Sequence, residues 1–283
     1  MPINKTIKLR GVDISSYQPI PDPAKLNISN LAFCWVKASE GKSSPSTNFV
    51  QQYEAVGKSA LLRGPYHFFR NNDDGIEQAK YFASIALKEY YVDDLPPMID
   101  VEDNIHNDIP ASTSVKRIRD FIDQVVNDFG VQPVIYTNYY YWRDHLGNPT
   151  GFNKSPLWLA SYSTNPPSLL KDWNKMTIWQ YTDKYNCDAF PKPIDADYFY
   201  GSIEDLWSIA ELVSFSKRSE YHPKVEAIQQ GLTDKGFDTH GVDGMFGNNT
   251  EKALISWQQA NGFTTNGAID ATQWARLFDI KYF

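Results

Sequence analysis

Acidic residues stand where short apolar runs end, and the sharpest case is the run PMIDVED. In it, Asp100 and Glu102 follow the apolar pair Met98 and Ile99 and stand two positions apart. On an extended strand such a pair projects to one face, roughly 6.6 Å apart at the Cα atoms. Two carboxyls on one face repel each other, which raises the pKa of one of them and keeps it protonated as an acid. One carboxylic acid beside one carboxylate is the equipment of glycoside hydrolysis.

Two further apolar runs carry acids at their ends. Asp13 lies in GVDISS, and Asp195 and Asp197 lie in IDADYF. In barrels the polar residues at the C-terminal ends of strands converge on one site, so we expect these acids to join Asp100 and Glu102. Asp195 and Asp197 share a strand face, and their spacing does not choose between them. An isolated Asp-x-Glu is more often a cap or a solvated rim, but acids on three strands favour a site.

Other chemistries have weaker support. The sequence has no GxSxG elbow, and Ser39 has no base near it in the chain. The histidines lack the spacing of a zinc peptidase, and His67 is expected to be a hydrogen-bonded strand residue. We therefore expect neither a metal nor a cofactor. Trp158 and Trp179, on predicted strands, are expected to lie in the core.

Eight short β-rich runs predict strands, over 11–18, 33–41, 64–69, 96–103, 133–138, 156–162, 176–183 and 194–199. Apolar residues at three- and four-residue spacing predict helices over 46–59, 75–89 and 112–130. The early gaps between strands are long enough for a crossover helix, whereas the last is not. We expect an α/β fold: an irregular eight-stranded TIM-like barrel with early helical and late short connections. A doubly wound open sheet is the alternative.

A second, smaller unit follows a helix-like stretch at 202–218 and a polar hinge. Helical stretches at 225–237 and within 241–263 and 267–278 flank a Gly-rich turn. Apolar residues of these stretches predict a small three-helix core: Val225, Ile228, Leu232, Ala253, Leu254 and Trp257. We expect the barrel over 1–207, the connection over 208–221 and the bundle over 222–283.

Composition excludes several classes of protein. The 283 residues are 42% hydrophobic and 22% charged, which excludes disorder as the main state. Lys and Arg total 27 against 34 Asp and Glu, and a net charge of −7 argues against a nucleic-acid partner. Cys34 and Cys187 are expected to be free, buried thiols. The opening MPINKTIKLRGVDISS has no apolar leader region and no later run is long enough to span a bilayer, so we expect synthesis without a signal peptide and no membrane insertion.

The runs GVDISSYQ, KASEG, GPYHFF, PPMIDVED, PVIYTN, LWLASY, IWQYTD and IDADYF together resemble glycoside hydrolase family 25, the lysozyme-type muramidases. The resemblance covers about residues 8–205 and follows all eight predicted strands in order. It implies five β/α units followed by three strands, a (β/α)5β3 barrel. It also implies hydrolysis of the β-1,4 bond between N-acetylmuramic acid and N-acetylglucosamine in peptidoglycan. Residues 222–278, with VDGMFGNNT and GAIDATQW, resemble the peptidoglycan-binding domain type 1.

The resemblance implies roles for individual residues. Glu102 resembles the proton donor to the glycosidic oxygen, and Asp100 the carboxylate that steadies the charged intermediate. Asp13 and Asp195 match two further acids of the family, but many relatives carry V-D-x-N where this chain has I-D-A-D. Which acid of the last strand faces the sugar therefore stays open. The residues expected to bind substrate are Tyr66, Tyr136, Asp197 and Gln180.

These observations favour a two-part cell-wall lysin, in which a wall-binding bundle tethers a muramidase and raises the local substrate concentration. Both substrate sugars carry an acetamido group, so we expect retention of anomeric configuration with substrate assistance. We expect a monomeric phage endolysin that accumulates in the bacterial cytoplasm and acts on the wall after release. One alternative is a non-enzymatic wall-binding protein, which would be expected to have lost an acid. The other is a chitinase-like glycosidase, whose longer D-x-x-D-x-D-x-E run is absent.

Overall fold

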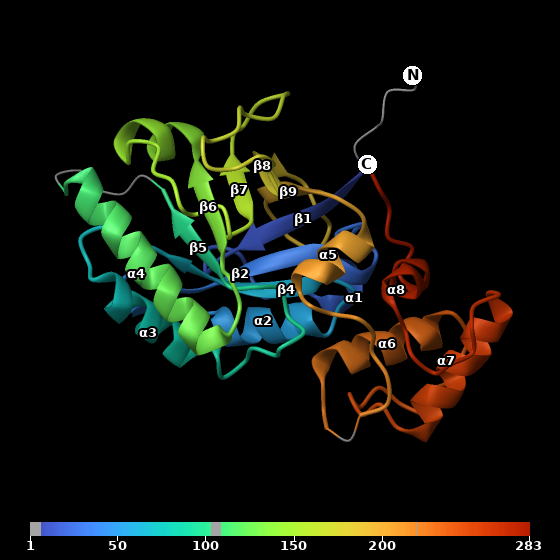
Figure 1. Cartoon of the computed structure of the whole chain (residues 1–283). Coiled ribbons are helices and arrows are strands. Elements are labelled where there is room, and N and C mark those ends of the chain that lie inside the picture. The colour runs from blue at the N-terminus through green and yellow to red at the C-terminus, as the bar shows by residue number, and fades with distance from the viewer. Residues whose placement is uncertain (1–6, 103–108, 219) are drawn as a thin grey trace.

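The computed structural model describes residues 7–102, 109–218 and 220–283, and its larger part is a closed barrel (Figure 1). Eight strands form the wall, and the pairing of the first with the second closes it. They are β1 (Lys8–Ile14), β2 (Phe33–Glu40), β4 (Leu62–Phe68), β5 (Met98–Val101), β6 (Val134–Asn138), β7 (Leu157–Ala160), β8 (Ile178–Tyr185) and β9 (Ile194–Tyr200). A two-residue strand, β3 (Ser44–Pro45), pairs with the end of β2. The eight predicted strands are confirmed, and the open-sheet alternative is wrong.

Helical segments follow each of the first five barrel strands. They are α1 (Pro23–Asn27), α2 (Phe49–Gly57), α3 (Gly75–Ala86), α4 (Ala111–Phe129) and the π-helical turn η1 (Tyr141–His145). The side chain of Asp74 caps α3 by accepting from the amides of Ile76 and Glu77, and α4 ends at Gly130, whose φ of 76° suits glycine. β7, β8 and β9 then follow without helices between them, which gives the (β/α)5β3 order.

β9 runs in the opposite direction to the other barrel strands. The pairs from β1 to β8 around the wall are parallel, whereas β9 is antiparallel to both β8 and β1. The start of β9, and not its end, therefore reaches the barrel end where the other strands finish. The acid of the last strand was expected at its C-terminal end, and the structure instead has Asp195 near the first residue of the antiparallel β9.

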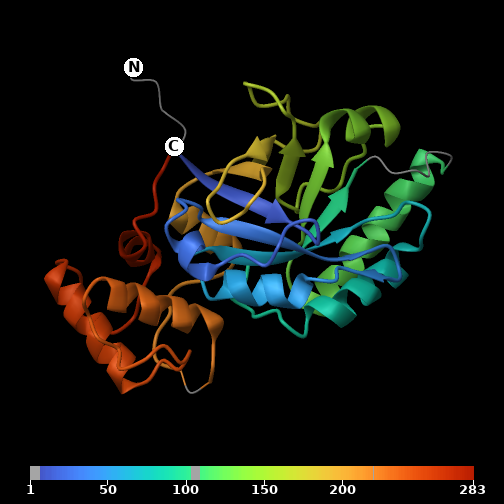
Figure 2. The same cartoon turned by 180° about the vertical axis from the view of Figure 1, so that it is seen from behind.

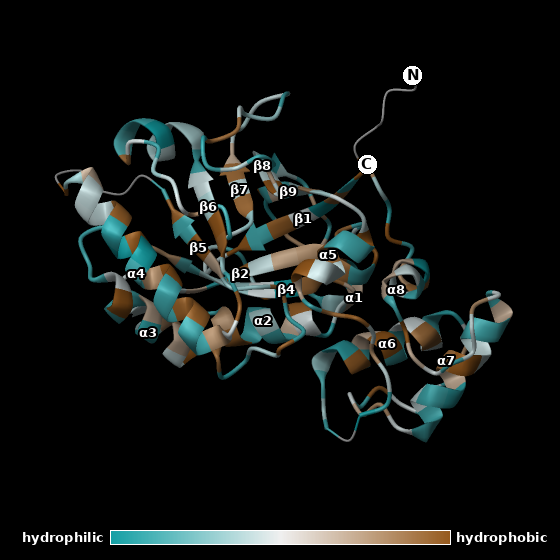
Figure 3. Ribbon diagram, viewed as in Figure 1, coloured by the Kyte–Doolittle hydropathy of each residue, from teal (hydrophilic) through white to brown (hydrophobic). Residues whose placement is uncertain are grey.

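Aromatic side chains fill the interior of the barrel. The rings of Trp35 and Trp158 lie 5.1 Å apart, and Tyr136 stands edge-on to Trp158 at 5.4 Å. Glycine is required beside them, since a Cβ on Gly11 would lie 2.0 Å from the ring of Phe33. Hydrophobic residues follow the strands, while α4 alternates between hydrophobic and hydrophilic positions, as expected of a helix that covers the wall (Figure 3). The barrel interior is therefore a packed core and not an open channel.

The C-terminal part is a bundle of three helices, α6 (Pro223–Asp234), α7 (Asn248–Ala260) and α8 (Ala271–Leu277), as predicted. Before it lies α5 (Ile203–Ile209), which is much shorter than the helix-like stretch predicted over 202–218. Beyond α5, Glu211 adopts a positive φ of 53°, and Phe215 pairs with Ile269 of the bundle as an isolated β-bridge. The connection to the bundle is therefore held in place by backbone pairing.

The bundle packs directly on the barrel, at the end where the parallel strands begin (Figures 1 and 2). The indole of Trp274 donates to the carbonyl of Ala60 at 3.0 Å, and the amide of Phe283 donates to the carbonyl of Lys8 at 2.9 Å. Lys224 is only 2% exposed and donates to the Ser59 carbonyl at 3.2 Å. The tether expected between the two parts is thus a packed interface.

Two further sequence features have structural counterparts. Cys34 and Cys187 are both free and buried, which confirms that prediction. Within the described ranges, no helix combines the length and apolar character needed to cross a membrane.

Candidate active site

The structure brings four predicted acids together at the end of the barrel opposite the bundle. Asp13 lies near the end of β1, Asp100 within β5, and Glu102 directly after β5. Asp195, near the start of β9, pairs with Asp13 across the strands. The charge of Asp195 acts on Asp13, and that of Glu102 acts on both Asp13 and Asp100. These acids therefore form one electrostatic site, as their positions at strand ends predicted.

Asp100 is the acid most removed from water among those that line the site. The residue is only 7% exposed, and its Oδ1 has no hydrogen-bond partner among the described residues. Burial raises the pKa of Asp100 well above its usual range, and the neighbouring Glu102 adds to the rise. A buried acceptor without a partner is costly, so Oδ1 is suited to bind a donor of a ligand.

Asp13 accepts a hydrogen bond from the amide of Gln180, and two phenols hold that amide in turn. Gln180 donates from Nε2 to Asp13 Oδ2 at 2.8 Å, and its Oε1 accepts from Tyr136 at 2.8 Å and Tyr162 at 3.1 Å. The two hydroxyl groups fix the amide so that its NH₂ points at the carboxylate. Burial, followed by the charge of Asp195, raises the pKa of Asp13, and the bond from Gln180 opposes that rise.

Register separates the two acids that the spacing could not. Asp195 lies level with Asp13, whereas Asp197 lies level with Gly11 and so one layer deeper in the barrel. Asp197 is 0% exposed, and its Oδ1 accepts from the indole of Trp158 at 3.1 Å. Its side chain has no solvent-exposed surface, and direct contact of Asp197 with substrate stays a prediction. Asp195 is partly exposed, and burial with the charge of Asp183 raises its pKa to about 6.

The other residues expected at the site also lie near the acids. Tyr66 and Tyr136 are each 7% exposed, and the charges of Asp13 and Asp100 act on both phenols. Gln180 is 2% exposed. Direct contact of these three side chains with substrate stays a prediction.

The Ser39 hydroxyl, for which the sequence offered no base, lies 2.9 Å from Nδ1 of His67. Both residues are fully buried outside the barrel lumen, under α3 and α4, and His67 Nε2 lies 3.2 Å from Gln78 Oε1. Burial lowers the pKa of His67 to about 3, so its ring is neutral. This confirms His67 as a hydrogen-bonded structural residue. Trp158 is fully buried in the core as expected, and Trp179 is 4% exposed.

Two residues near the acids were not singled out from the sequence. Lys37 shares the inward face of β2 with Phe33 and Trp35, and its charge acts on Asp100. The alternation in FCWVKASE was the signal that could have placed it. Tyr162 follows β7 and is 57% exposed, so sequence alone gave it no fixed position.

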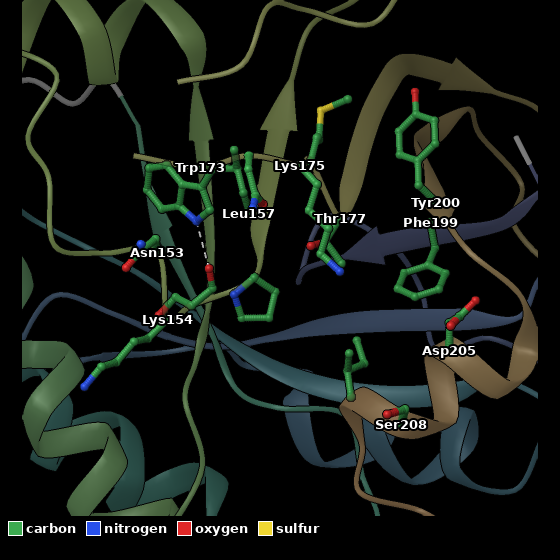
Figure 4. A pocket seen from close by; sticks show the side chains of 15 residues that line it. Asn153, Lys154, Leu157, Trp173, Lys175, Thr177, Phe199, Tyr200, Asp205 and Ser208 are labelled. Atoms are coloured by element: carbon green, nitrogen blue, oxygen red, sulfur yellow. Dashed lines mark hydrogen bonds between the residues drawn. The ribbon is translucent and has the colours of Figure 1, made fainter. Parts of the chain in front are cut away.

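A cavity of about 370 Å³ lies away from these acids, between the starts of β7 and β8 and the end of β9 (Figure 4). Leu157, Thr177, Tyr200 and Asp205 line it, together with Trp173, whose indole donates to the Ser155 carbonyl at 2.9 Å. None of the four site acids belongs to its lining. The converging carboxyls, and not this cavity, mark the candidate active site.

Known proteins share both parts of the chain. Residues 12–189 match the family model of Glycosyl hydrolases family 25, and residues 221–277 match that of the Putative peptidoglycan binding domain. The chain belongs to glycosyl hydrolase family 25. It is 33% identical to the N,O-diacetylmuramidase of Chalaropsis sp over 215 residues, which cover 71% of this chain and 99% of that protein. It is 26% identical over 259 residues to the autolytic lysozyme of Clostridium acetobutylicum, covering 90% of this chain and 74% of that protein.

Solved structures agree. The bacterial lysozyme from Streptomyces coelicolor superposes with a TM-score of 0.68 at 27% identity, over 71% of this chain and 96% of that one. The family GH25 lysozyme from Aspergillus fumigatus gives 0.65 at 33% identity, over 72% and 99%. The chain is therefore a glycoside hydrolase of the muramidase or lysozyme type, with a peptidoglycan-binding domain at its C-terminal side.

Proposed function

We propose that this family 25 hydrolase cleaves the β-1,4 bond from N-acetylmuramic acid to N-acetylglucosamine in bacterial peptidoglycan. The observation that carries the proposal is the pairing of Asp100 with Glu102 at the end of β5, facing Asp13 and Asp195. The wall-binding domain supports a polymeric wall substrate, as do the muramidases and lysozymes among the relatives.

In the proposed mechanism, Glu102 donates its proton to the glycosidic oxygen as the bond to the anomeric carbon breaks. The acetamido oxygen of the same sugar attacks that carbon and forms a cyclic oxazolinium ion. Asp100 accepts a hydrogen bond from the acetamido N–H and balances the positive charge. Water then adds to the anomeric carbon and gives a proton to Glu102, which restores the enzyme with net retention.

Asp13 and Asp195 have supporting roles in this proposal. Asp13 is fixed by Gln180 beside Asp195, so the pair presents a second carboxyl group to the sugar across the site from β5. Asp195, whose pKa is about 6, changes its charge near neutral pH. The two acids are therefore suited to orient sugar hydroxyls and to add negative potential where positive charge develops.

The proposal is tested on purified peptidoglycan, by reducing the released fragments with borohydride and identifying them by mass spectrometry. Reduced muramic acid at the new ends is expected. Reduced glucosamine ends, or free stem peptides, would contradict the bond assignment. Glu102→Gln is expected to lower release by a factor on the order of 10²–10⁴ and to leave wall binding intact. Exposed Glu77→Gln provides the matched control.

Retention is tested separately. Proton NMR of chitooligosaccharide products, recorded before mutarotation, is expected to show the β-anomer first, and the α-anomer would contradict substrate assistance.

We further propose that the protein is a phage endolysin, which accumulates in the bacterial cytoplasm and is released to the wall at lysis. Cytoplasmic expression is then expected to leave cells intact until the membrane is permeabilised, after which turbidity falls. Lysis without permeabilisation would contradict this route.

A further inference from the structure

Three side chains form a charged cluster at the ends of β2 and β4. Lys37 Nζ donates to Glu40 Oε2 at 2.7 Å, and Arg70 Nε donates to Glu40 Oε1 at 2.9 Å. Both cations also lie over the ring of Phe68, each 4.7 Å from its centroid. The three side chains are 17–28% exposed, so water screens them only in part. We call them the Lys37–Glu40–Arg70 cluster.

The cluster stands beside Asp100. Lys37 is level with Tyr66 of β4, but its long stem carries Nζ upward to Glu40 and Phe68. Phe68 is level with Asp100 of β5. β4 lies between β2 and β5, so Nζ, over the ring of Phe68, lies beside the part of β5 that carries Asp100.

The charges of the cluster do not cancel. Glu40 is shared by two cations, so the three groups carry a net charge of +1. Burial acts to raise the pKa of Glu40, but the bonds from Lys37 and Arg70 lower it overall, and Glu40 is therefore ionised. The cluster therefore carries one excess positive charge, and Lys37 is its member whose backbone lies on the inward face of β2 with Phe33 and Trp35.

A nearby positive charge stabilises the ionised form of the Asp100 carboxyl group. The charged and titratable groups that face it in the described part of the chain are Asp13 from β1, Lys37 and Glu40 from β2, Tyr66 from β4, Tyr136 from β6 and Glu102 from the end of β5. Burial and Glu102 push the pKa of Asp100 upward, and Lys37 is the cation in this set that opposes them. The proposed mechanism requires Asp100 as an anion.

We propose that Lys37, held by Glu40 over the Phe68 ring, is a positioning residue that favours the anionic form of Asp100 during hydrolysis. The inference rests on the proposed function, because it assigns Asp100 the part of the carboxylate that steadies the acetamido group. Arg70 also binds Glu40, so that the Glu40 carboxylate does not fully neutralise the charge of Lys37.

Lys37→Met tests the inference. The acid limb of the pH profile of kcat/KM reports the essential base of the free enzyme. Without the cation this limb is expected to move upward by about one pH unit, so that kcat/KM falls roughly tenfold below the wild-type limb and little on the plateau. Lys37→Arg, which keeps the charge, is expected to restore the wild-type limb. Lys42→Met is the matched control, since Lys42 is 55% exposed and lies 3.6 Å from Asp73.

Glu40→Gln tests the sign. It removes the anion, keeps an amide oxygen for Lys37 to bind and raises the net charge of the cluster by one. The limb is expected to move downward, opposite to Lys37→Met. This variant decides the question if thermal melts show that Lys37→Met does not fold.

An unmoved limb in folded Lys37→Met, or an upward shift in Glu40→Gln, would overturn the role of Lys37. A wild-type enzyme that releases no reduced muramic acid would instead overturn the proposed function, so the two failures are distinguishable.

Discussion

Replacing Trp274 with alanine is expected to weaken the barrel as well as the bundle. Trp274 is 0% exposed, its rings lie 5.8 Å from those of Trp207 and Phe215, and its indole donates to the carbonyl of Ala60 at 3.0 Å. A buried tryptophan-to-alanine change costs about 3–5 kcal/mol. Roughly 1 kcal/mol of that comes from the lost hydrogen bond. Since whole domains are stable by about 5–15 kcal/mol, the loss is a large fraction of the total.

The measurement is guanidinium unfolding of the full chain, followed in parallel by residual wall-lytic activity and by far-UV circular dichroism. Activity reports the barrel, and circular dichroism is dominated by helices of both parts. We expect the two probes to change together in the wild type, and both midpoints to fall in Trp274→Ala. Trp274→Phe keeps most of the buried ring and is expected to lose about 1–2 kcal/mol. If the activity midpoint stayed at the wild-type value while the bundle unfolded early, the interface would not stabilise the barrel.

Four further substitutions test other parts of the structure. Asp195→Asn is expected to lower kcat/KM on purified peptidoglycan by a factor on the order of 10²–10⁴. Asp197→Asn is expected to change kcat/KM on the same substrate by less than about tenfold. Equal losses in the two variants would contradict the depth assigned to Asp197. Because burial raises the pKa of Asp197 in the folded chain, its ionisation costs stability as pH rises, so Asp197→Asn is expected to gain stability relative to wild type with rising pH in chemical unfolding. Burial lowers the pKa of Lys224 to about 7, so from pH 7 to 9 the unfolded chain holds a proton that the folded chain has lost. The free energy of unfolding of the wild type is therefore expected to rise relative to that of Lys224→Met by about 1.4 kcal/mol per pH unit. A difference that does not change with pH would refute this. Gln180→Met removes the donor to Asp13 and is expected to lower kcat about tenfold or more with a smaller change in KM, so an effect on KM alone would indicate that Gln180 only binds sugar.

The barrel was predictable because its strands are short apolar runs separated by helices with clear periodicity. In α4, the buried positions Ile118, Phe121, Ile122 and Val125 repeat at the spacing of one helical face. The reversal of β9 was not predictable, since a strand carries the same alternation whichever way it runs. The early end of α5 was missed for a similar reason. The apolar residues after Ile209 keep a helical spacing, but the backbone of Phe215 pairs with that of Ile269, which is far along the chain.

The site was predictable where it depended on strand ends and unpredictable where it depended on depth. Asp13, Asp100 and Glu102 follow or end apolar runs, so their convergence followed from the barrel alone. The difference between Asp195 and Asp197 comes from the register of β9 against β1, which no local signal encodes. Lys37 was missed because its backbone lies level with Met98, two residues before Asp100, and only the length of its side chain brings the charge to the level of Phe68 and Asp100.

The position of the bundle changes what wall binding can do for catalysis. A flexible tether would let the enzyme search a volume set by linker length and raise the local substrate concentration throughout it. Here Lys224, Trp274 and Phe283 bind the bundle to the end of the barrel where β1 and β4 begin, and the acids lie at the opposite end. If the bundle binds the wall as proposed, the packed interface fixes its position relative to the acids. We then expect wall binding to increase the hydrolysis of glycan strands long enough to reach both ends of the molecule more than that of short fragments.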